Sequence, residues 1–242
     1  MSADPNDKAL ASLISEGVPQ TMDDVVGLMK RIDELLPSSD GLKWFNLLYL
    51  LVTRRVMEDP GGFADARYLA HLDVVFANLY FNAIGKLGGR PQGVPRSWQA
   101  LLEVRHRADI DRIQFAVAGM NAHINHDLPI ALVQANNELG IEPDLHSPQH
   151  DDFEKINLIL EAALPQSLEF LATGMLGEIA QDSGKIGRLL ALWSVRKARD
   201  NGWNNAVVLK RIEDVPFVRK SFLASLDRMT GALGRALLLA FR

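Results

Sequence analysis

Apolar residues recur along most of the chain at the three- and four-residue spacing of amphipathic helices. Thr21 and Asp24 have the spacing of a helix N-cap, and a run of such apolar positions begins directly after them at Val25. Glycine, proline and aspartate residues divide the chain into further segments of this kind. The spacing predicts helices over about 22–36, 40–59, 63–86, a short stretch from 97, 110–128, 130–139, 153–164, 168–182, 185–200 and 216–240.

The alternating pattern of β-strands is missing, apart from the short β-branched pair Val207 and Val208. We therefore expect an all-α fold, a single-domain helical bundle of about nine to eleven helices that spans residues 1–242. Residues 1–20 could form a loosely packed N-terminal segment.

Loops and prolines mark the breaks between the predicted helices. The clearest loops are 88–95, which is rich in glycine and proline, and 140–152. Pro129 and Pro165 are expected to end or interrupt the helices in which they fall, because proline lacks the N–H that a helix interior needs.

The composition restricts the classes of function. Hydrophobic residues make up 48% of the chain, which is ample for a core. The net charge of −4 comes from interspersed acidic and basic residues, so no basic surface is available for nucleic acid. Cysteine is absent, which excludes disulfides and thiolate metal sites and leaves His, Asp and Glu as metal ligands.

No targeting or membrane segment is visible. The N-terminus is polar and acidic and lacks the apolar core of a secretory signal. The apolar run at 236–241 is far shorter than the roughly 20 residues of a transmembrane helix, so it reads as part of a terminal helix that docks on the core. A cytoplasmic location is the expectation that follows.

One stretch of the helix predicted over 110–128 carries ionisable side chains within an apolar setting. His123, His126 and Asp127 fall within one arc of roughly a quarter turn, and His123 and Asp127 are neighbours four residues apart. The rest of this helix is mostly apolar or small, so it has little polar surface to offer water. A buried imidazole and carboxylate must find partners or change their pKa values, and active sites are commonly built this way.

Three interpretations of this cluster are open. In the first it is structural: His123 donates to a backbone carbonyl, Asp127 caps the loop around Pro129, and His126 faces solvent. In the second, His123 and Asp127 bind one divalent metal ion, zinc or iron. In the third, the cluster works without a metal as an acid–base or substrate-binding site.

A metal site needs at least one more ligand, because two side chains from one helix are too few. Asp73 is a candidate, since a carboxylate among apolar residues is costly unless paired; the alternative is a salt bridge to an arginine. Asn157 interrupts the apolar stripe of another helix, where a core amide is the alternative. His150 and Asp152 stand just before that stripe, and Asp151 or Asp152 is the expected N-cap of its helix.

The chain resembles a bacterial family catalogued as domain of unknown function 5995. The resemblance rests on NAHINHDLP at 121–129, LDVVFANLYFNA at 72–83 and DDFEKIN at 151–157. The family pattern does not restrict position 126 to histidine, and it implies no particular activity. The site residues that the resemblance implies are Asn121, His123, Asn125 and Asp127.

A fainter similarity is to the all-helical zinc-dependent phospholipase and nuclease superfamily. Its helices carry G-x-x-x-H-x-x-x-D followed by proline, as Gly119, His123, Asp127 and Pro129 do here. This chain lacks the free N-terminal tryptophan and the further histidines that build a trinuclear zinc cluster. The similarity therefore implies at most one metal ion.

These residues favour an enzyme of hydrolase or lyase type that acts on a small molecule in a pocket between helices. The expected catalytic residues are His123, Asp127 and Asn121. If a divalent metal ion is present, its expected ligands are His123, Asp127 and Asp73. The expected substrate contacts are Asn125, Asn157 and His126. The alternative is a non-enzymatic helical module that binds a ligand or partner and uses the His/Asp network to fix its structure.

Overall fold

The computed structural model describes residues 5–59, 61–88, 93–142, 144–173 and 183–239. Within these ranges the chain forms helices and no strand, which confirms the predicted all-α class. The helices pack as one body around a shared apolar core. They are α1 (Pro5–Ser15), α2 (Met22–Leu35), α3 (Gly41–Glu58), α4 (Ala66–Gly85), η1 (Lys86–Gly88), α5 (Arg96–Leu102), α6 (Arg112–Ala122), η2 (His123–Asp127), α7 (Leu128–Leu139), α8 (Pro148–Thr173), α9 (Ser183–Leu192), α10 (Val195–Arg211) and α11 (Pro216–Leu239).

Polar caps and a glycine fix the ends of several helices. Thr21 and Asp24 form a reciprocal capping box at the start of α2, as predicted. Asp40 and Asp65 each accept a backbone N–H in the first turn of α3 and α4. Gly140 ends α7 in the left-handed conformation, with φ of 67°, which only glycine adopts without strain.

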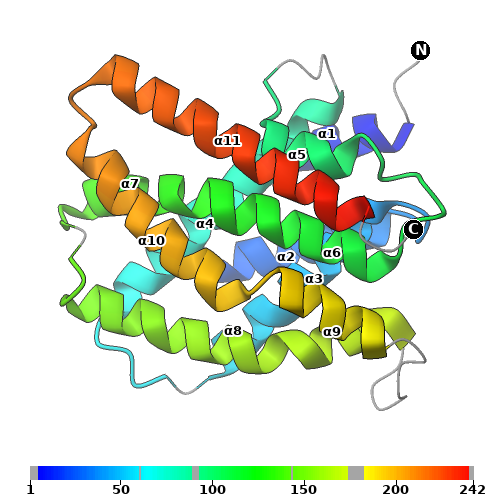
Figure 1. Cartoon of the computed structure of the whole chain (residues 1–242), viewed down its shortest axis with the longest axis horizontal. Coiled ribbons are helices and arrows are strands. Elements are labelled where there is room, and N and C mark those ends of the chain that lie inside the picture. Colours follow the sequence, from blue (N-terminus) through cyan, green and yellow to red (C-terminus); the bar gives the residue numbers. More distant parts are fainter. Residues whose placement is uncertain (1–4, 60, 89–92, 143, 174–182, 240–242) are drawn as a thin grey trace.

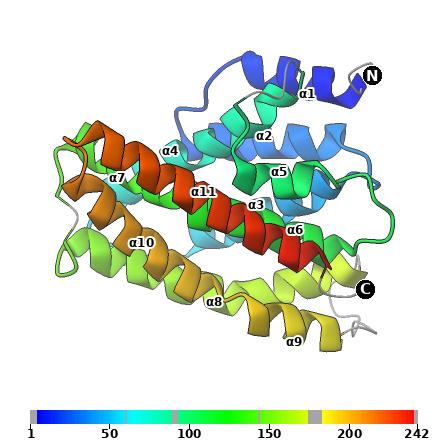
Figure 2. The ribbon, with the colours of Figure 1, turned by 45° about the horizontal axis from the view of Figure 1, so that its top comes forward.

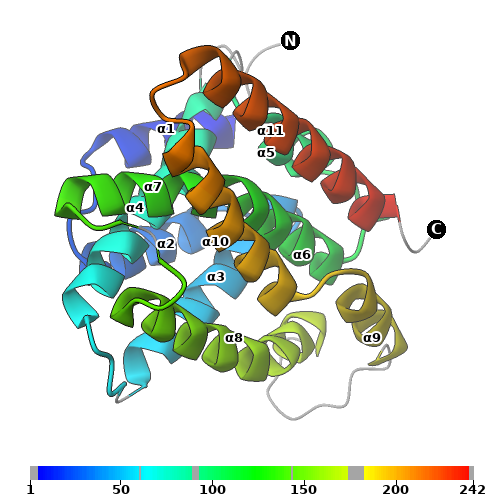
Figure 3. The same ribbon diagram turned by 60° about the vertical axis from the view of Figure 1, so that its left-hand side comes forward.

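The segment from α6 through η2 to α7 runs through the middle of the molecule and carries the predicted site (Figure 1). α3 and α11 pack against α6, while α4 and α10 pack against α7. Figure 2 places α1 and α2 at one end of the molecule and α8 and α9 at the other. In Figure 3, α10 runs along the central segment between α11 and α8.

Two glycines allow α3 and α6 to approach each other closely. A Cβ atom added to Gly119 of α6 would lie 2.3 Å from the Phe45 ring of α3, and one added to Gly41 of α3 would lie 2.4 Å from the Phe115 ring of α6. The two phenylalanines are buried and have no room to withdraw. The small residues therefore set the distance between these helices, and with it the position of the site.

Pro165 does not interrupt a helix, contrary to the prediction. α8 continues through it from Pro148 to Thr173, and so includes 168–173, while 174–182 lie outside the described residues. Pro165 and Glu161, whose carbonyl loses its partner, are both exposed on the surface of α8. Water can therefore satisfy that carbonyl, and the missing hydrogen bond costs little.

The helix predicted over 185–200 is in fact two helices. Ser194 has an extended backbone between α9 and α10, and its side chain accepts the Lys197 N–H at the start of α10. A serine N-cap competes with continuation of the preceding helix. Val207 and Val208 lie within α10, so this β-branched pair forms no strand.

Residues 1–20 are not loosely packed in the part that the structure describes. α1 packs against α4 and η1, and Leu10 is fully buried. Gly85 of α4 lies close to Ile14 of α1: a Cβ atom added to Gly85 would be 3.1 Å from the Ile14 side chain. Leu10 and Leu13 of α1 therefore belong to the core, and Ile14 packs against it.

No described helix has the length and apolar character needed to cross a membrane. Leu237 and Leu238 near the end of α11 are buried against the core, as the docking of a terminal helix predicts.

Candidate functional site

The central segment changes its helical geometry where the predicted site residues lie. Residues His123–Asp127 form a π-helical turn, in which the Leu128 N–H bonds to the His123 carbonyl five residues earlier. Pro129 follows in the first turn of α7, where its missing N–H leaves the helix without one interior bond. Turns of this kind are rare in helices and often occur at functional sites.

Asp127 is the centre of a buried hydrogen-bond network. Its carboxylate accepts Nε1–H of Trp98 at 2.9 Å, Nδ1–H of His123 at 3.0 Å and Nδ1–H of His126 at 2.7 Å. Burial alone would raise the pKa of Asp127, but the hydrogen bonds from the two histidines hold that pKa below its usual range. Asp127 is therefore an ionised, fully satisfied acceptor.

His123 is a buried, neutral imidazole. Burial lowers its pKa, an effect that the bond to Asp127 only partly offsets. Its ring lies parallel to that of Phe76, with the centroids 3.5 Å apart, and the Tyr49 ring packs against it at 4.7 Å. Because ionised Asp127 can only accept, Nδ1 of His123 carries the ring proton. Nε2 is then an unprotonated acceptor, and it has no hydrogen-bond partner among the described residues.

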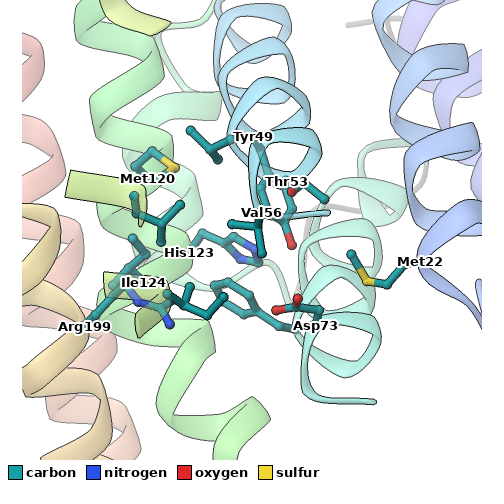
Figure 4. A pocket seen from close by; sticks show the side chains of 13 residues that line it. Met22, Tyr49, Thr53, Val56, Asp73, Met120, His123, Ile124 and Arg199 are labelled. Atoms are coloured by element: carbon teal, nitrogen blue, oxygen red, sulfur yellow. The ribbon is translucent and has the colours of Figure 1, made fainter. Parts of the chain in front are cut away.

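A cavity of about 40 Å³ lies beside this imidazole, among α2, α3, α4, α6, α8, α10 and η2. Figure 4 shows His123 between Arg199 on one side and Asp73 on the other. Tyr49 and Thr53 contribute hydroxyl groups, and the remaining walls are apolar. The lining residues are Met22, Tyr49, Val52, Thr53, Val56, Asp73, Phe76, Met120, His123, Ile124, Ile156, Leu160 and Arg199.

Asp73 enters this cavity from α4, as its placement among apolar residues led us to expect. Burial raises the pKa of Asp73 to about 6, and the charge of Arg199 offsets part of this effect. Within the described residues its carboxylate makes no ion pair or hydrogen bond, so the alternative of a direct salt bridge to an arginine is wrong.

Arg199 is the site residue that sequence reasoning missed. Only 6% of it is exposed, its guanidinium stacks on the Phe153 ring at 4.3 Å, and its Nε donates to the amide oxygen of Asn157. Burial lowers the pKa of Arg199 to about 10, although nearby Asp73 opposes the shift. Along the sequence it is one of several charged residues at the start of α10, so only the packing of α10 on α8 identifies it.

Asn157 supports Arg199 and does not line the cavity. It is fully buried, accepts from Arg199, and donates to Asp200 at 3.1 Å. The structure thus places it as a core amide that joins α8 to α10, the alternative that the sequence left open.

Three further predicted residues lie on the other side of η2, toward α11. His126 donates to Asp127 through Nδ1, and its Nε2 lies 3.7 Å from a carboxylate oxygen of Asp227. Asn121 donates to the backbone carbonyl of Thr230 at 2.9 Å, and Asn125 donates to Asn121. They do not line the cavity.

Among these three, His126 is the one that titrates. Burial would lower its pKa, but Asp127 and Asp227 on either side raise it above the usual value. The side chain is buried, so the alternative in which His126 faces solvent is wrong. Asp127 likewise bonds side chains in place of capping the loop around Pro129, and His123 donates to Asp127 and not to a backbone carbonyl.

His150 and Asp152 lie outside the cavity. α8 begins at Pro148, so neither Asp151 nor Asp152 is its N-cap. The buried Asp152 carboxylate instead accepts the backbone N–H groups of residues 64 and 65, just before α4. Asp152 therefore holds the segment that leads into α4, whose N-cap is Asp65.

The arrangement does not assemble the predicted metal ligands. No group of three or more His, Asp or Glu side chains that could hold a metal ion occurs in the described parts of the chain. Asp127 bonds Nδ1 of His123 and does not line the cavity. Only Nε2 of His123 and the carboxylate of Asp73 are then left as possible metal ligands in the cavity. A catalytic zinc ion usually has three protein ligands.

The pattern of a family described as a family of unknown function, DUF5995, matches residues 22–240. The chain belongs to this family. Its match covers every residue of the cavity and of the Asp127 network, and the family description assigns no activity. No curated protein and no solved structure gives a significant match, so the fainter similarity to zinc-dependent phospholipases and nucleases gains no support.

Proposed function

We propose that this DUF5995 protein is an enzyme that transfers a proton to or from a small molecule bound in the cavity, with His123 as general base. The observation that carries the proposal is the state of Nε2: an unprotonated, buried nitrogen beside a cavity, without a hydrogen-bond partner in the described structure. An unsatisfied buried acceptor is costly, so its position beside a cavity favours a role toward a ligand.

In the proposed mechanism, Nε2 accepts a proton from the substrate or from a water molecule held next to it. Asp127 stabilises the resulting imidazolium through the bond to Nδ1 and keeps the ring in the productive tautomer. Trp98 and His126 act as positioning residues, because they hold the carboxylate of Asp127 in place. The proton returns from Nε2 to the leaving group or product.

Arg199 is the group that would stabilise negative charge as it develops on the substrate. Its guanidinium is held by Phe153 and Asn157, so little reorganisation is needed when the charge appears. Removal of a proton from carbon followed by elimination, and attack of an activated water on an ester or amide, both develop such a charge. The proposal therefore covers lyase and hydrolase chemistry.

The site as described supports the metal-free version of this chemistry. His123 and Asp73 offer two possible metal ligands in the cavity, and a divalent zinc or iron ion would need a further ligand. Two alternative functions compete with the proposal. One is a metal-dependent enzyme, and the other is a module that binds a ligand without turnover.

The experiment compares the wild type with His123→Asn in D₂O. The side-chain amide of asparagine carries no basic Nε2 but can still donate to Asp127, so we expect the fold to be retained. The protein, purified without a polyhistidine tag, is incubated with a mixture of small carboxylic acids, amino acids and esters, and NMR follows deuterium uptake, elimination and hydrolysis. We expect at least one compound to react, and the variant to be slower by about 10²-fold or more.

The control variant is His71→Asn, which alters a half-buried histidine of α4 that pairs with Glu138 outside the cavity. It should react like the wild type. Equal rates for His123→Asn and the wild type would overturn the proposal. Loss of activity with a chelator and its return with zinc would establish the metal-dependent version, and binding without any reaction would establish the ligand-binding module.

A further inference from the structure

The cavity carries two opposite charges that are not paired with each other. Arg199 enters from α10 and Asp73 from α4, and His123 lies between them (Figure 4). No ion pair joins the two side chains, although each influences the charge state of the other. Two unpaired charges at opposite sides of one cavity are complementary to a ligand that carries both signs.

Arg199 provides the position for an anion. The residue is more than nine-tenths buried, yet its guanidinium bonds only the neutral amide of Asn157, and no carboxylate pairs with it in the described parts of the chain. Glu154 of α8, whose charge also acts on Arg199, bonds Arg196 instead at 3.0 Å. A buried guanidinium without a counter-ion is costly, and its planar donors match a carboxylate.

Asp73 provides the position for a cation. Its carboxylate makes no hydrogen bond among the described residues, although it lies at the wall of a mostly apolar cavity. An ammonium group would supply both the opposite charge and the missing donors. A ligand with only a negative charge would meet this carboxylate as a repulsive neighbour.

The walls between Arg199 and Asp73 limit the polarity and the size of the part of the ligand between its two charged groups. They are formed mostly by aliphatic side chains and methionine, together with the rings of Phe76 and Tyr49, and such apolar walls favour an alkyl body. The cavity volume of about 40 Å³ has room for a few water molecules, since one water needs at least about 10–15 Å³. A short chain of a few carbon atoms is therefore the size that fits.

We propose that the cavity binds a small aminocarboxylate, with its carboxylate at Arg199, its ammonium at Asp73 and a short alkyl body between them. This deepens the proposed function and rests on it, because His123 would act on the bound molecule. A carbon–hydrogen bond of that body would then face Nε2 of His123, which is the position from which a base removes a proton.

The test measures binding of matched compounds by isothermal titration calorimetry. Alanine, β-alanine and 4-aminobutyrate are each compared with two analogues, in which a methyl group replaces the ammonium or the carboxylate. For alanine these analogues are isobutyrate and isopropylamine. We expect at least one aminocarboxylate to bind at least about tenfold more tightly than both of its analogues. Equal binding of an analogue, or no binding of any aminocarboxylate, overturns the proposal.

Two variants assign the charges to the two residues. Asp73→Asn should weaken aminocarboxylate binding at least about tenfold and leave binding of the carboxylate analogue unchanged or stronger. Arg199→Gln should weaken both, whereas Arg196→Gln, which alters a neighbouring arginine paired with Glu154, should weaken neither. Circular dichroism verifies that each variant is folded. Unchanged selectivity in Asp73→Asn overturns the assignment.

Binding and turnover separate this inference from the proposed function. His123→Asn should still bind the aminocarboxylate, because His123 contributes neither charge. Binding of aminocarboxylates without proton exchange at any carbon would leave the inference standing and contradict the proposed function. Turnover of a compound that lacks an ammonium group, without binding of aminocarboxylates, would support the proposed function and contradict the inference.

Discussion

The ring of Phe76 lies parallel to the imidazole of His123, with an interplanar angle of 2° and a centroid distance of 3.5 Å. One face of the imidazole is therefore covered by an apolar ring from α4, while its two nitrogens face Asp127 and the cavity. This contact excludes water from His123 and contributes to the burial that keeps it neutral.

Replacement of Phe76 by leucine should raise the pKa of His123 toward its usual value. The smaller side chain uncovers part of the imidazole, so water can solvate the charged form. NMR titration of the imidazole Cε1–H signals, assigned by the loss of one signal in His123→Asn, measures the change. Phe81→Leu is the control, because Phe81 is a buried aromatic residue of the same helix that does not line the cavity. A lower or unchanged pKa in Phe76→Leu would contradict this account.

Asp127→Asn should change the tautomer of His123. The amide group of asparagine can donate to Nδ1, which would move the ring proton to Nε2 and remove the base from the cavity. We expect the rate of any proton exchange to fall by roughly 10⁴-fold, as for the equivalent change in a Ser-His-Asp triad. The ¹⁵N shifts of the two ring nitrogens report the tautomer without knowledge of a substrate.

Trp98→Phe is the matched control for that variant. It removes one of the donors to Asp127 but leaves the carboxylate and its bond to His123. It should lower the free energy of unfolding by about 1.5–3 kcal/mol, the value of a hydrogen bond to a charged group. The Nδ1–H tautomer should persist, and a change of tautomer in this variant would show that Asp127 alone does not determine it.

The helices could be predicted from sequence because the information that specifies them is local. Thr21 and Asp24 form their cap within one turn, and the apolar spacing after them needs no knowledge of other helices. The same holds for His123 and Asp127, whose four-residue separation on a helix brings their side chains together. The π-turn that carries them was not predicted, since the apolar periodicity of a helix does not reveal one extra residue in a turn.

The remainder of the site depends on packing between distant segments. Arg199 lines the cavity only because α10 places it on Phe153 and Asn157 of α8, a juxtaposition that no local pattern encodes. Asn121 has an interhelical bond to α11, so the motif around it indicated burial correctly but not which side of η2 faces the cavity. Local sequence thus identified one part of the site, and tertiary contacts supply the rest.

Asp73 should make the protein less stable as the pH rises. Its pKa is about 6 in the folded state, above the 3.8 of the unfolded state, so its contribution is most favourable below pH 3.8 and is lost as the pH rises through 6. The loss is up to about 3 kcal/mol, at 1.36 kcal/mol for each pKa unit. Asp73→Asn should therefore unfold at a higher denaturant concentration than the wild type at neutral pH, with a smaller difference near pH 4.

Urea unfolding at several pH values measures this effect. Glu34→Gln on the exposed face of α2 controls for the loss of one negative charge, and it should show little change at any pH. If Asp73→Asn were less stable than the wild type at neutral pH, Asp73 would have a stabilising partner, and the aminocarboxylate site would lose its cation-binding group.

Gly119→Ala should destabilise the protein by about 1–3 kcal/mol, although alanine is the better helix former. The added Cβ would lie 2.3 Å from Cγ of the buried Phe45, so α3 and α6 would have to separate. Because Phe45 also packs edge-on against His123 at 5.9 Å, the same displacement should disturb the site. The NMR signals of His123 should therefore shift in the folded variant.

Gly27→Ala is the matched control for the helix itself. Gly27 lies inside α2, and an added Cβ would have no atom within 4 Å. Without a clash, the lower entropy of the unfolded chain should raise the free energy of unfolding by about 0.4–1 kcal/mol. Opposite signs for the two substitutions would show that contact with Phe45, and not helix propensity, requires glycine at position 119. Equal stabilisation by both would mean that α3 and α6 can separate at no cost, and the helix spacing would not then determine where His123 lies.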